Sequence, residues 1–283
     1  MKLISFTVAG RESFGIVQGD GVIDARLAAG SRFPTLAEAL TDMESLAAVA
    51  IRAPDHALAS VTLLPPIPRS ARIICVGLNY KSHIAEMDRE APQHPMLFPR
   101  YPDSLVGHGS PLLRPQASDQ FDFEGELAFV IGRAGRAIPA SRALQHVAGY
   151  ACFNDGSIRD FQRHTSQFLP GKNFSSSGSF GPWLTTADEV PDLGERRLET
   201  RLNGQTVQSA KLDDLLFGVD ALVEYVSTIW SVQPGDVIVT GTAGGVGAGR
   251  KPPLWMKPGD TVSVEISGIG LHTNPIAQEA KPA

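Results

Sequence analysis

Residues 121–130 read FDFEGELAFV, an apolar stretch with two glutamates two positions apart. The apolar run predicts a strand over 123–131, in which Glu124 and Glu126 project from the same face. Two like charges in an apolar strand are costly to bury unless a cation lies between them. Carboxylate oxygens favour Mg²⁺, Mn²⁺ or Ca²⁺, although an edge strand with both glutamates in water fits the pattern too.

A third carboxylate follows another apolar strand, which the sequence predicts over 149–154. Asp155 comes at the end of this strand, where ligands usually gather. Three carboxylates with open positions suit a catalytic Mg²⁺ ion that keeps some of its water. The same aspartate could instead cap the turn over 159–163, so both interpretations stay open.

A possible acid–base pair lies in residues 77–87, which read GLNYKSHIAEM. The segment predicts a short helix over 80–87, and its His83 and Glu86 are three apart and therefore share a face. A carboxylate so placed can orient an imidazole and raise its basicity, as a water-activating base requires. A solvent-exposed pair is the other interpretation.

Composition excludes several classes of protein. The chain has 283 residues with a formal charge of −5, so it is long enough for one or two domains and lacks the basic surface of a nucleic-acid-binding protein. It has no apolar stretch of about 18 residues, so we expect no membrane segment and a cytoplasmic location. Cys75 and Cys152 form no CxxC pair and are expected to be buried thiols.

Glycine and proline indicate the class of fold and a boundary. The 28 glycines and 21 prolines indicate many turns, and therefore an α+β fold with more strand than helix. Three prolines among residues 65–68 interrupt the pattern. We therefore predict a small N-terminal α+β domain over 1–68 and a strand-dominated catalytic domain over 69–283.

Longer motifs carry a resemblance to a known family. They are GLNYxxHxxE from residue 77, FEGELAFVIG from 123, GYxCFNDxSxRD from 149, GKNF from 171, GPWL from 181, GDVIVTGTAGGVG from 235 and KPGD from 257. In this order, over residues 70–278, they resemble the fumarylacetoacetate hydrolase superfamily, in its branch of acylpyruvases and 2-hydroxyhepta-2,4-diene-1,7-dioate isomerases. The resemblance implies a mixed β-roll that is usually a homodimer.

The resemblance also implies roles for individual residues. Glu124, Glu126 and Asp155 would bind Mg²⁺ or Mn²⁺, with Ca²⁺ possible in crystals. His83 and Glu86 would form a water-activating dyad on a lid segment.

Further positions match the family's contacts to substrate. Lys172 matches a lysine near the reacting carbonyl, and Arg159 and Thr242 match positions that hold a substrate carboxylate, with Gln162 as a further candidate. Arg100 stands where many relatives have the lysine of a Phe-x-Lys step, so we expect its guanidinium to contact the substrate carboxylate.

These features predict a metal-dependent hydrolase that cleaves a carbon–carbon bond in a β-diketo acid of the acylpyruvate type. An isomerase, hydratase, dehydratase or decarboxylase acting on a 2-oxo or 2-hydroxydienoate acid through the same metal enolate is the alternative. A non-catalytic protein that binds a keto acid is a third possibility. The glycines of 241–249 lack the ending of a phosphate loop, and the chain contains no Gly-x-Ser-x-Gly or His-Glu-x-x-His motif.

Overall fold

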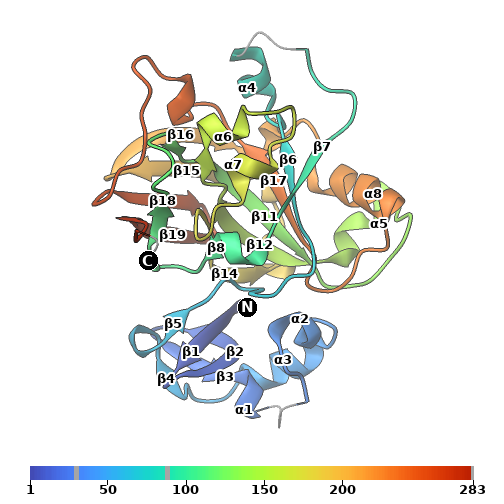
Figure 1. Ribbon diagram of the computed structural model, residues 1–283. Coiled ribbons are helices and arrows are strands. Elements are labelled where there is room, and N and C mark those ends of the chain that lie inside the picture. Colours follow the sequence, from blue (N-terminus) through green and yellow to red (C-terminus); the bar gives the residue numbers. More distant parts are fainter. Residues whose placement is uncertain (29–31, 87–89, 282–283) are drawn as a thin grey trace.

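The computed structural model describes residues 1–28, 32–86 and 90–281, apart from the side chains of residues 83, 85 and 86 (Figure 1). A mixed sheet of twelve strands runs through it. Its order is β4 (His56–Ala57), β3 (Gly21–Asp24), β2 (Arg11–Gln18), β1 (Lys2–Val8), β14 (Gly178–Thr186), β12 (Val147–Asn154), β11 (Gly125–Ile131), β17 (Val237–Thr242), β6 (Ile73–Gly77) and β7 (Met96–Arg100). Two short strands join it, β5 (Thr62–Leu63) beside β1 and β8 (Leu105–Val106) beside β14.

Two smaller sheets complete the strands. One has five strands in the order β16 (Gln205–Lys211), β15 (Arg197–Leu202), β18 (Thr261–Ile266), β19 (Gly270–Gln278) and β9 (Leu112–Arg114). The other pairs β10 (Phe121–Asp122) with β13 (Ser157–Ile158). The prediction of a strand-dominated α+β fold with mixed sheets is confirmed.

The helices are short and lie between the strands. They are α1 (Ala25–Ala28), α2 (Leu36–Ala39), α3 (Met43–Val49), α4 (Lys81–Glu86), α5 (Ala140–Ala143), α6 (Arg159–Gln162), α7 (Leu169–Lys172) and α8 (Val219–Ile229). The 3₁₀ turns are η1 (Leu58–Ser60), η2 (Pro102–Ser104), η3 (Leu144–His146), η4 (Ala187–Glu189), η5 (Leu193–Glu195), η6 (Leu212–Asp214) and η7 (Gly247–Gly249). On α8, Leu222, Val223 and Val226 share the buried face, as an amphipathic helix requires.

The strand predicted over 123–131 is interrupted at its start. Residues 123 and 124 belong to neither β10 nor β11, so Glu124 precedes the strand that carries Glu126. Every residue of β11 is buried, because the strand lies inside the sheet between β12 and β17. A continuous apolar run suits a strand that is covered on both faces.

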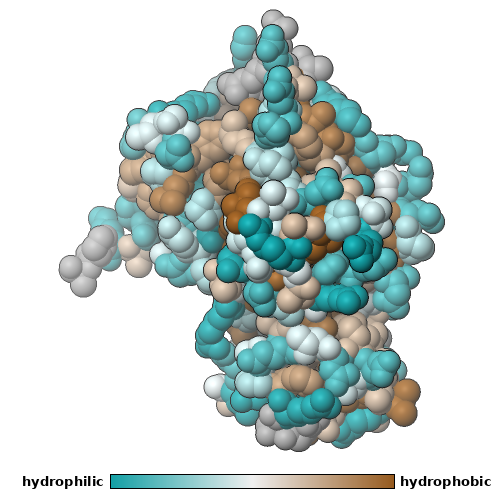
Figure 2. Space-filling model, turned by 90° about the vertical axis from the view of Figure 1, so that its right-hand side faces the viewer, coloured by the Kyte–Doolittle hydropathy of each residue, from teal (hydrophilic) through white to brown (hydrophobic). Residues whose placement is uncertain are grey.

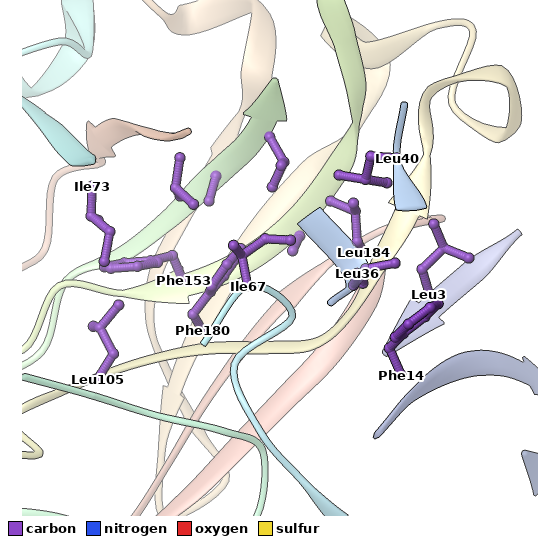
Figure 3. Packing of buried hydrophobic residues seen from close by; sticks show 14 of the residues in the cluster. Leu3, Phe14, Leu36, Leu40, Ile67, Ile73, Leu105, Phe153, Phe180 and Leu184 are labelled. Atoms are coloured by element: carbon purple, nitrogen blue, oxygen red, sulfur yellow. The ribbon is translucent and has the colours of Figure 1, made fainter. Parts of the chain in front are cut away.

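The N-terminal segment continues the large sheet. Strand β1 pairs with β14 through Lys2 opposite Thr185 and Leu3 opposite Leu184. One apolar core also joins the two parts, and Figure 3 shows its Phe14 beside Leu3 and Leu184. The boundary predicted at residue 68 stays a prediction, and the β-sheet and the core both cross it.

The outer face beside α5 and α8 is mixed in character. Figure 2 turns this side toward the viewer and shows hydrophobic residues scattered among hydrophilic ones. Within the described ranges, no helix has both the length and the apolar character needed to cross a membrane. The homodimer and the cytoplasmic location stay predictions.

A buried histidine, His272 on β19, lies against a second, half-buried one, His108. The His108 and His272 ring centroids are 5.6 Å apart, and His272 is 1% exposed. Neither ring nitrogen of His272 has a hydrogen-bond partner among the described residues. Burial, with a smaller effect from His108, lowers the pKa of His272 to about 3.

We predict that this histidine destabilises the fold in acid. Its pKa in the unfolded chain is about 6.5, so the unfolded state binds more protons below that value and the free energy of unfolding falls as the pH falls. The loss between about pH 7 and about pH 5 is about 2 kcal/mol. Thermal melts of His272→Phe should show a smaller loss over this interval than the parent protein. Equal losses in the two proteins would contradict the prediction.

Candidate metal centre

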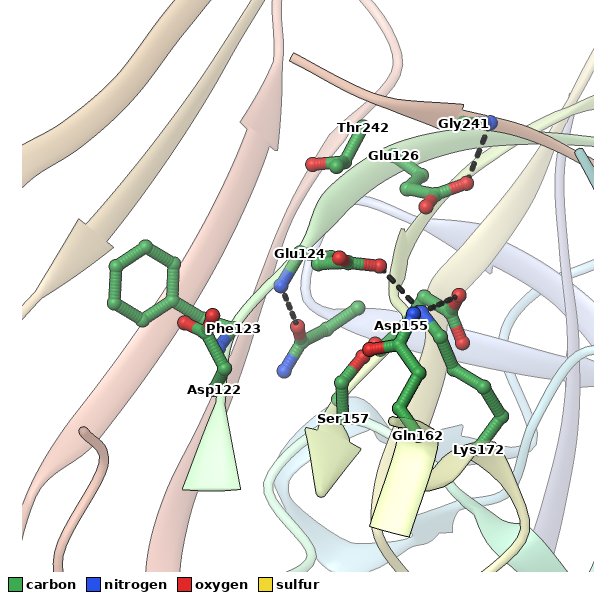
Figure 4. Close-up of polar contacts among 12 residues, drawn as sticks. Asp122, Phe123, Glu124, Glu126, Asp155, Ser157, Gln162, Lys172, Gly241 and Thr242 are labelled. Carbon is green, nitrogen blue, oxygen red and sulfur yellow. Dashed lines mark hydrogen bonds and ion pairs between the residues drawn. The ribbon is translucent and has the colours of Figure 1, made fainter. Parts of the chain in front are cut away.

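Three carboxylates converge where β11 and β12 meet. In the register of these strands Gly125 lies opposite Asn154, and beyond it the amide of Asp155 donates to the carbonyl of Glu124 over 2.8 Å. Glu126 lies two residues further along, opposite Thr242 of β17. Glu124, Glu126 and Asp155 are buried, and each offers an oxygen within 4.8 Å of the others (Figure 4).

Two cations contact Glu124. Lys172, at the end of α7, places its Nζ 2.5 Å from Glu124 Oε2 and 2.6 Å from Asp155 Oδ2. Arg159, the first residue of α6, has its Nη2 2.6 Å from Glu124 Oε1. Burial opposes the charge of Glu124, but Arg159 and Lys172 together lower the pKa of its carboxyl to about 2. Glu124 is therefore ionised throughout the physiological range.

Glu126 has no such partner. Its Oε2 accepts a hydrogen bond of 2.6 Å from the amide of Gly241, and no cation among the described residues forms an ion pair with it. Burial, followed by the charges of Asp155 and Glu124, raises its pKa well above the usual value. Removal from water therefore disfavours the ionised form of Glu126, and a further cation is needed to keep it charged.

The surrounding charges fit a divalent metal ion. Four buried carboxylates face three buried cations: Asp122, Glu124, Glu126 and Asp155 against Arg100, Arg159 and Lys172. The seven side chains together carry a net charge of −1, and a bound divalent ion would change it to +1. Oxygen-only ligands suit Mg²⁺ or Mn²⁺, which would be held by Glu124, Glu126 and Asp155, and the prediction of such a cofactor is confirmed.

Arg100 does not lie where the sequence-based prediction put it. Its side chain is 0% exposed and is not part of the cavity wall. Its Nη1 donates to Asp155 Oδ1 over 2.5 Å, and its Nη2 donates to Ser177 Oγ over 2.8 Å. The guanidinium thus fixes the orientation of a metal ligand from behind, and it is not placed to hold a substrate carboxylate.

Sequence reasoning gave no role to Asp122 and Gln208. Asp122 Oδ2 accepts from Arg159 Nε over 2.8 Å, and its carboxylate also accepts from the amides of Gly247 and Ala248. The alternation of Asp122 with Glu124 and Glu126 in FDFEGE was the available signal. Gln208 lies on β16, far away in the sequence, and nothing near it in the chain marked it.

A cavity of about 620 Å³ opens beside the carboxylates. Glu124, Glu126, Arg159, Gln162, Lys172 and Thr242 line it. The side-chain oxygen Oε1 of Gln162 accepts from Arg159 Nη1 over 2.8 Å, and its side-chain nitrogen Nε2 has no partner among the described residues. The Thr242 hydroxyl donates to the carbonyl of Gly125 over 3.0 Å and accepts from Gln208 Nε2. Gln162 can therefore donate to a substrate directly. The Thr242 hydroxyl would first have to give up its hydrogen bond to the carbonyl of Gly125.

The predicted dyad belongs to α4, which begins three residues after Leu78. The side chains of His83 and Glu86 are outside the described residues, so their roles stay predictions. The chain reaches α4 through Leu78, which lines the cavity and has a φ of 55°, a left-handed conformation unusual for leucine. Asn79 anchors this turn by donating to the carbonyls of Phe217 and Thr240.

The two glutamates should respond oppositely to neutralisation in metal-free protein. At neutral pH Glu124→Gln leaves Arg159 and Lys172 short of a buried partner and should lower the melting temperature. In metal-free protein Glu126 must either take up a proton or keep a buried charge with no cation beside it among the described residues, and both are costly. Glu126→Gln removes this cost and retains the acceptor for Gly241, so it should raise the melting temperature. Each substitution should change the free energy of unfolding by on the order of 1–3 kcal/mol.

Thermal melts in the presence of chelator measure both effects. Added Mn²⁺ should stabilise the parent protein and the surface control Glu195→Gln, and it should stabilise Glu126→Gln much less. If neutralising Glu126 lowers the melting temperature as much as neutralising Glu124, the charge imbalance described above is wrong.

Comparisons with known proteins match most of the chain. The family model described as fumarylacetoacetate (FAA) hydrolase C-terminal matches residues 72–277. A human protein, oxaloacetate tautomerase FAHD2A, mitochondrial, is 37% identical over 265 residues, which are 91% of this chain and 84% of that protein. Oxaloacetate tautomerase YisK of Bacillus subtilis is 34% identical over 279 residues, 97% of this chain and 93% of that protein.

A solved structure extends the similarity to a metal complex. The structure is that of maleylpyruvate hydrolase from Sphingobium sp. SYK-6 with manganese(II) and pyruvate. It is 27% identical with a TM-score of 0.82, and the match covers 99% of this chain and 100% of that one. The chain therefore belongs to the fumarylacetoacetate hydrolase family.

Proposed function

We propose that this protein is a metal-dependent tautomerase that interconverts the enol and keto forms of oxaloacetate or a similar 2-oxo acid. The observation that carries the proposal is the similarity to the human and Bacillus subtilis tautomerases over more than nine-tenths of the chain. It reverses the order of preference drawn from the sequence, in which the carbon–carbon hydrolase stood first and the isomerase second.

The charges around the cavity suit a substrate that becomes an anionic enolate. A divalent ion held by Glu124, Glu126 and Asp155 supplies Lewis-acid stabilisation of an enolate oxygen. Burial lowers the pKa of Lys172, but Asp155 and Glu124 raise it by more, so the lysine stays protonated. Its ammonium can therefore stabilise negative charge on a substrate oxygen without giving up its proton.

The reaction moves one proton and breaks no carbon–carbon bond. A proton leaves the enol oxygen and a proton is added to the carbon at the other end of the C=C bond, so the atoms balance without water. His83, oriented by Glu86, is our candidate for the group that carries the proton, because α4 follows directly on the turn at Leu78. The amide nitrogen of Gln162 is our candidate donor to the substrate carboxylate.

Decay of the ultraviolet enol band of oxaloacetate tests the proposal. Mn²⁺-loaded protein should accelerate the decay, and chelator or Asp155→Asn should reduce the rate by about 100-fold or more, because both remove the ion that stabilises the enolate. Glu195→Gln is the control for a carboxylate on the surface. Full activity of the chelated Asp155→Asn protein would refute a metal-dependent reaction.

A carbon–carbon hydrolase is the second candidate, favoured by the similarity to maleylpyruvate hydrolase. In that reaction water attacks the distal carbonyl, and an acid is released together with pyruvate. Acylpyruvates incubated with the Mn²⁺ protein distinguish the two reactions. Stoichiometric release of pyruvate would establish the hydrolase, whereas enol decay of oxaloacetate with intact acylpyruvates would establish the tautomerase.

A further inference from the structure

Four cationic side chains line the cavity, and they fall into two groups. Lys172 and Arg159 form ion pairs with the buried carboxylates. Arg163 and Arg250 also line the cavity, and no ion pair joins either of them to an acidic group in the described part of the chain. The second group therefore carries positive charge that no acidic group of the described residues neutralises.

Hydrogen bonds to backbone carbonyls hold Arg250, although no acidic group in the described ranges pairs with it. Its Nη2 donates to the carbonyl of Val207 over 2.6 Å and to that of Gly245 over 3.1 Å, and its Nε donates to Gly245 over 3.1 Å. These carbonyls come from β16 and from the loop after β17. Its Nη1 has no hydrogen bond within the described residues, so this one nitrogen of the guanidinium stays available.

Arg163 lacks the hydrogen bonds to backbone carbonyls that hold Arg250. It is exposed at the end of α6, and its side chain makes no hydrogen bond to the described residues. An exposed arginine without such contacts loses more conformational entropy on binding an anion than one already held by hydrogen bonds. Arg250 is thus the preorganised cation, and Arg163 is a matched control of the same type in the same cavity.

The balance of charge indicates what Arg250 would bind. The buried groups carry one excess negative charge, and a divalent ion changes this to one excess positive charge. The 2-oxo carboxylate of a substrate bound at the ion would neutralise that positive charge. The guanidinium of Arg250 then remains for a second anionic group, and its Nη1 can donate a charge-assisted hydrogen bond to a carboxylate.

We propose that Arg250 is a specificity-determining residue that binds a second carboxylate, so that the site selects 2-oxo dicarboxylic acids over monocarboxylic ones. The inference rests on the proposed function for the place of the first carboxylate, at the metal ion. Arg250 takes part in binding and leaves the proton transfer to other groups.

Malate and lactate provide the test, because both can chelate a metal through a 2-hydroxy carboxylate and only malate has a second carboxylate. Calorimetric titration of the Mn²⁺-loaded protein should show malate binding about 10- to 100-fold more tightly than lactate. In Arg250→Met this preference should fall to about threefold or less while lactate affinity is retained. Arg163→Met should keep the preference.

Equal binding of the two acids by the parent protein, or an undiminished preference in Arg250→Met, would overturn the inference. If Arg250→Met binds neither acid, Arg250→Lys decides: a retained preference for malate supports recognition by charge, and equal affinities refute it. A parent protein that prefers malate and does not tautomerise oxaloacetate would refute the proposed function alone. The binding test therefore separates the two failures.

Discussion

The carboxylates buried where β11 and β12 meet can stay ionised only where cations from other segments reach them. Arg100 comes from the end of β7, Arg159 from α6 and Lys172 from α7, so three separate parts of the chain supply the compensation. Removing one partner from a buried ion pair leaves an uncompensated charge and destabilises a fold strongly. The same interactions that make the carboxylate cluster tolerable therefore hold the surrounding loops and short helices in place.

The metal ligands could be predicted from sequence because their signal is local. Glu124 and Glu126 stand two apart in one apolar run, and Asp155 directly follows the next such run. The strand predicted over 123–131 was wrong at its start, since Glu124 lies before β11. The three carboxylates nevertheless lie together. The place of Glu124 across from Asp155 comes from the register of β11 and β12, which continues for one residue beyond the ladder.

The surroundings of the ligands could not be predicted in the same way. Arg100 was assigned to substrate because it stands where relatives have the lysine of a Phe-x-Lys step, and nothing in the sequence indicates that Asp155, 55 residues away, accepts from its guanidinium. Arg250 lacks a local signal too, since one of its carbonyl partners, on Val207, is 43 residues distant. Such contacts depend on how the sheets and loops meet, and residue spacing reports only neighbours on one helix or strand.

The pairing of β1 with β14 has a consequence for how this chain can be shortened. A β-strand with unpaired amides and carbonyls is a template for joining another chain, and proteins cover such edges. Residues 2 and 3 cover part of β14, and the apolar side chains of Leu3 and Phe14 seal the core beside it. A truncated protein that begins near residue 69 would expose both the strand edge and the core. Its characteristic failure would be self-association through that edge, even though every metal ligand would still be present.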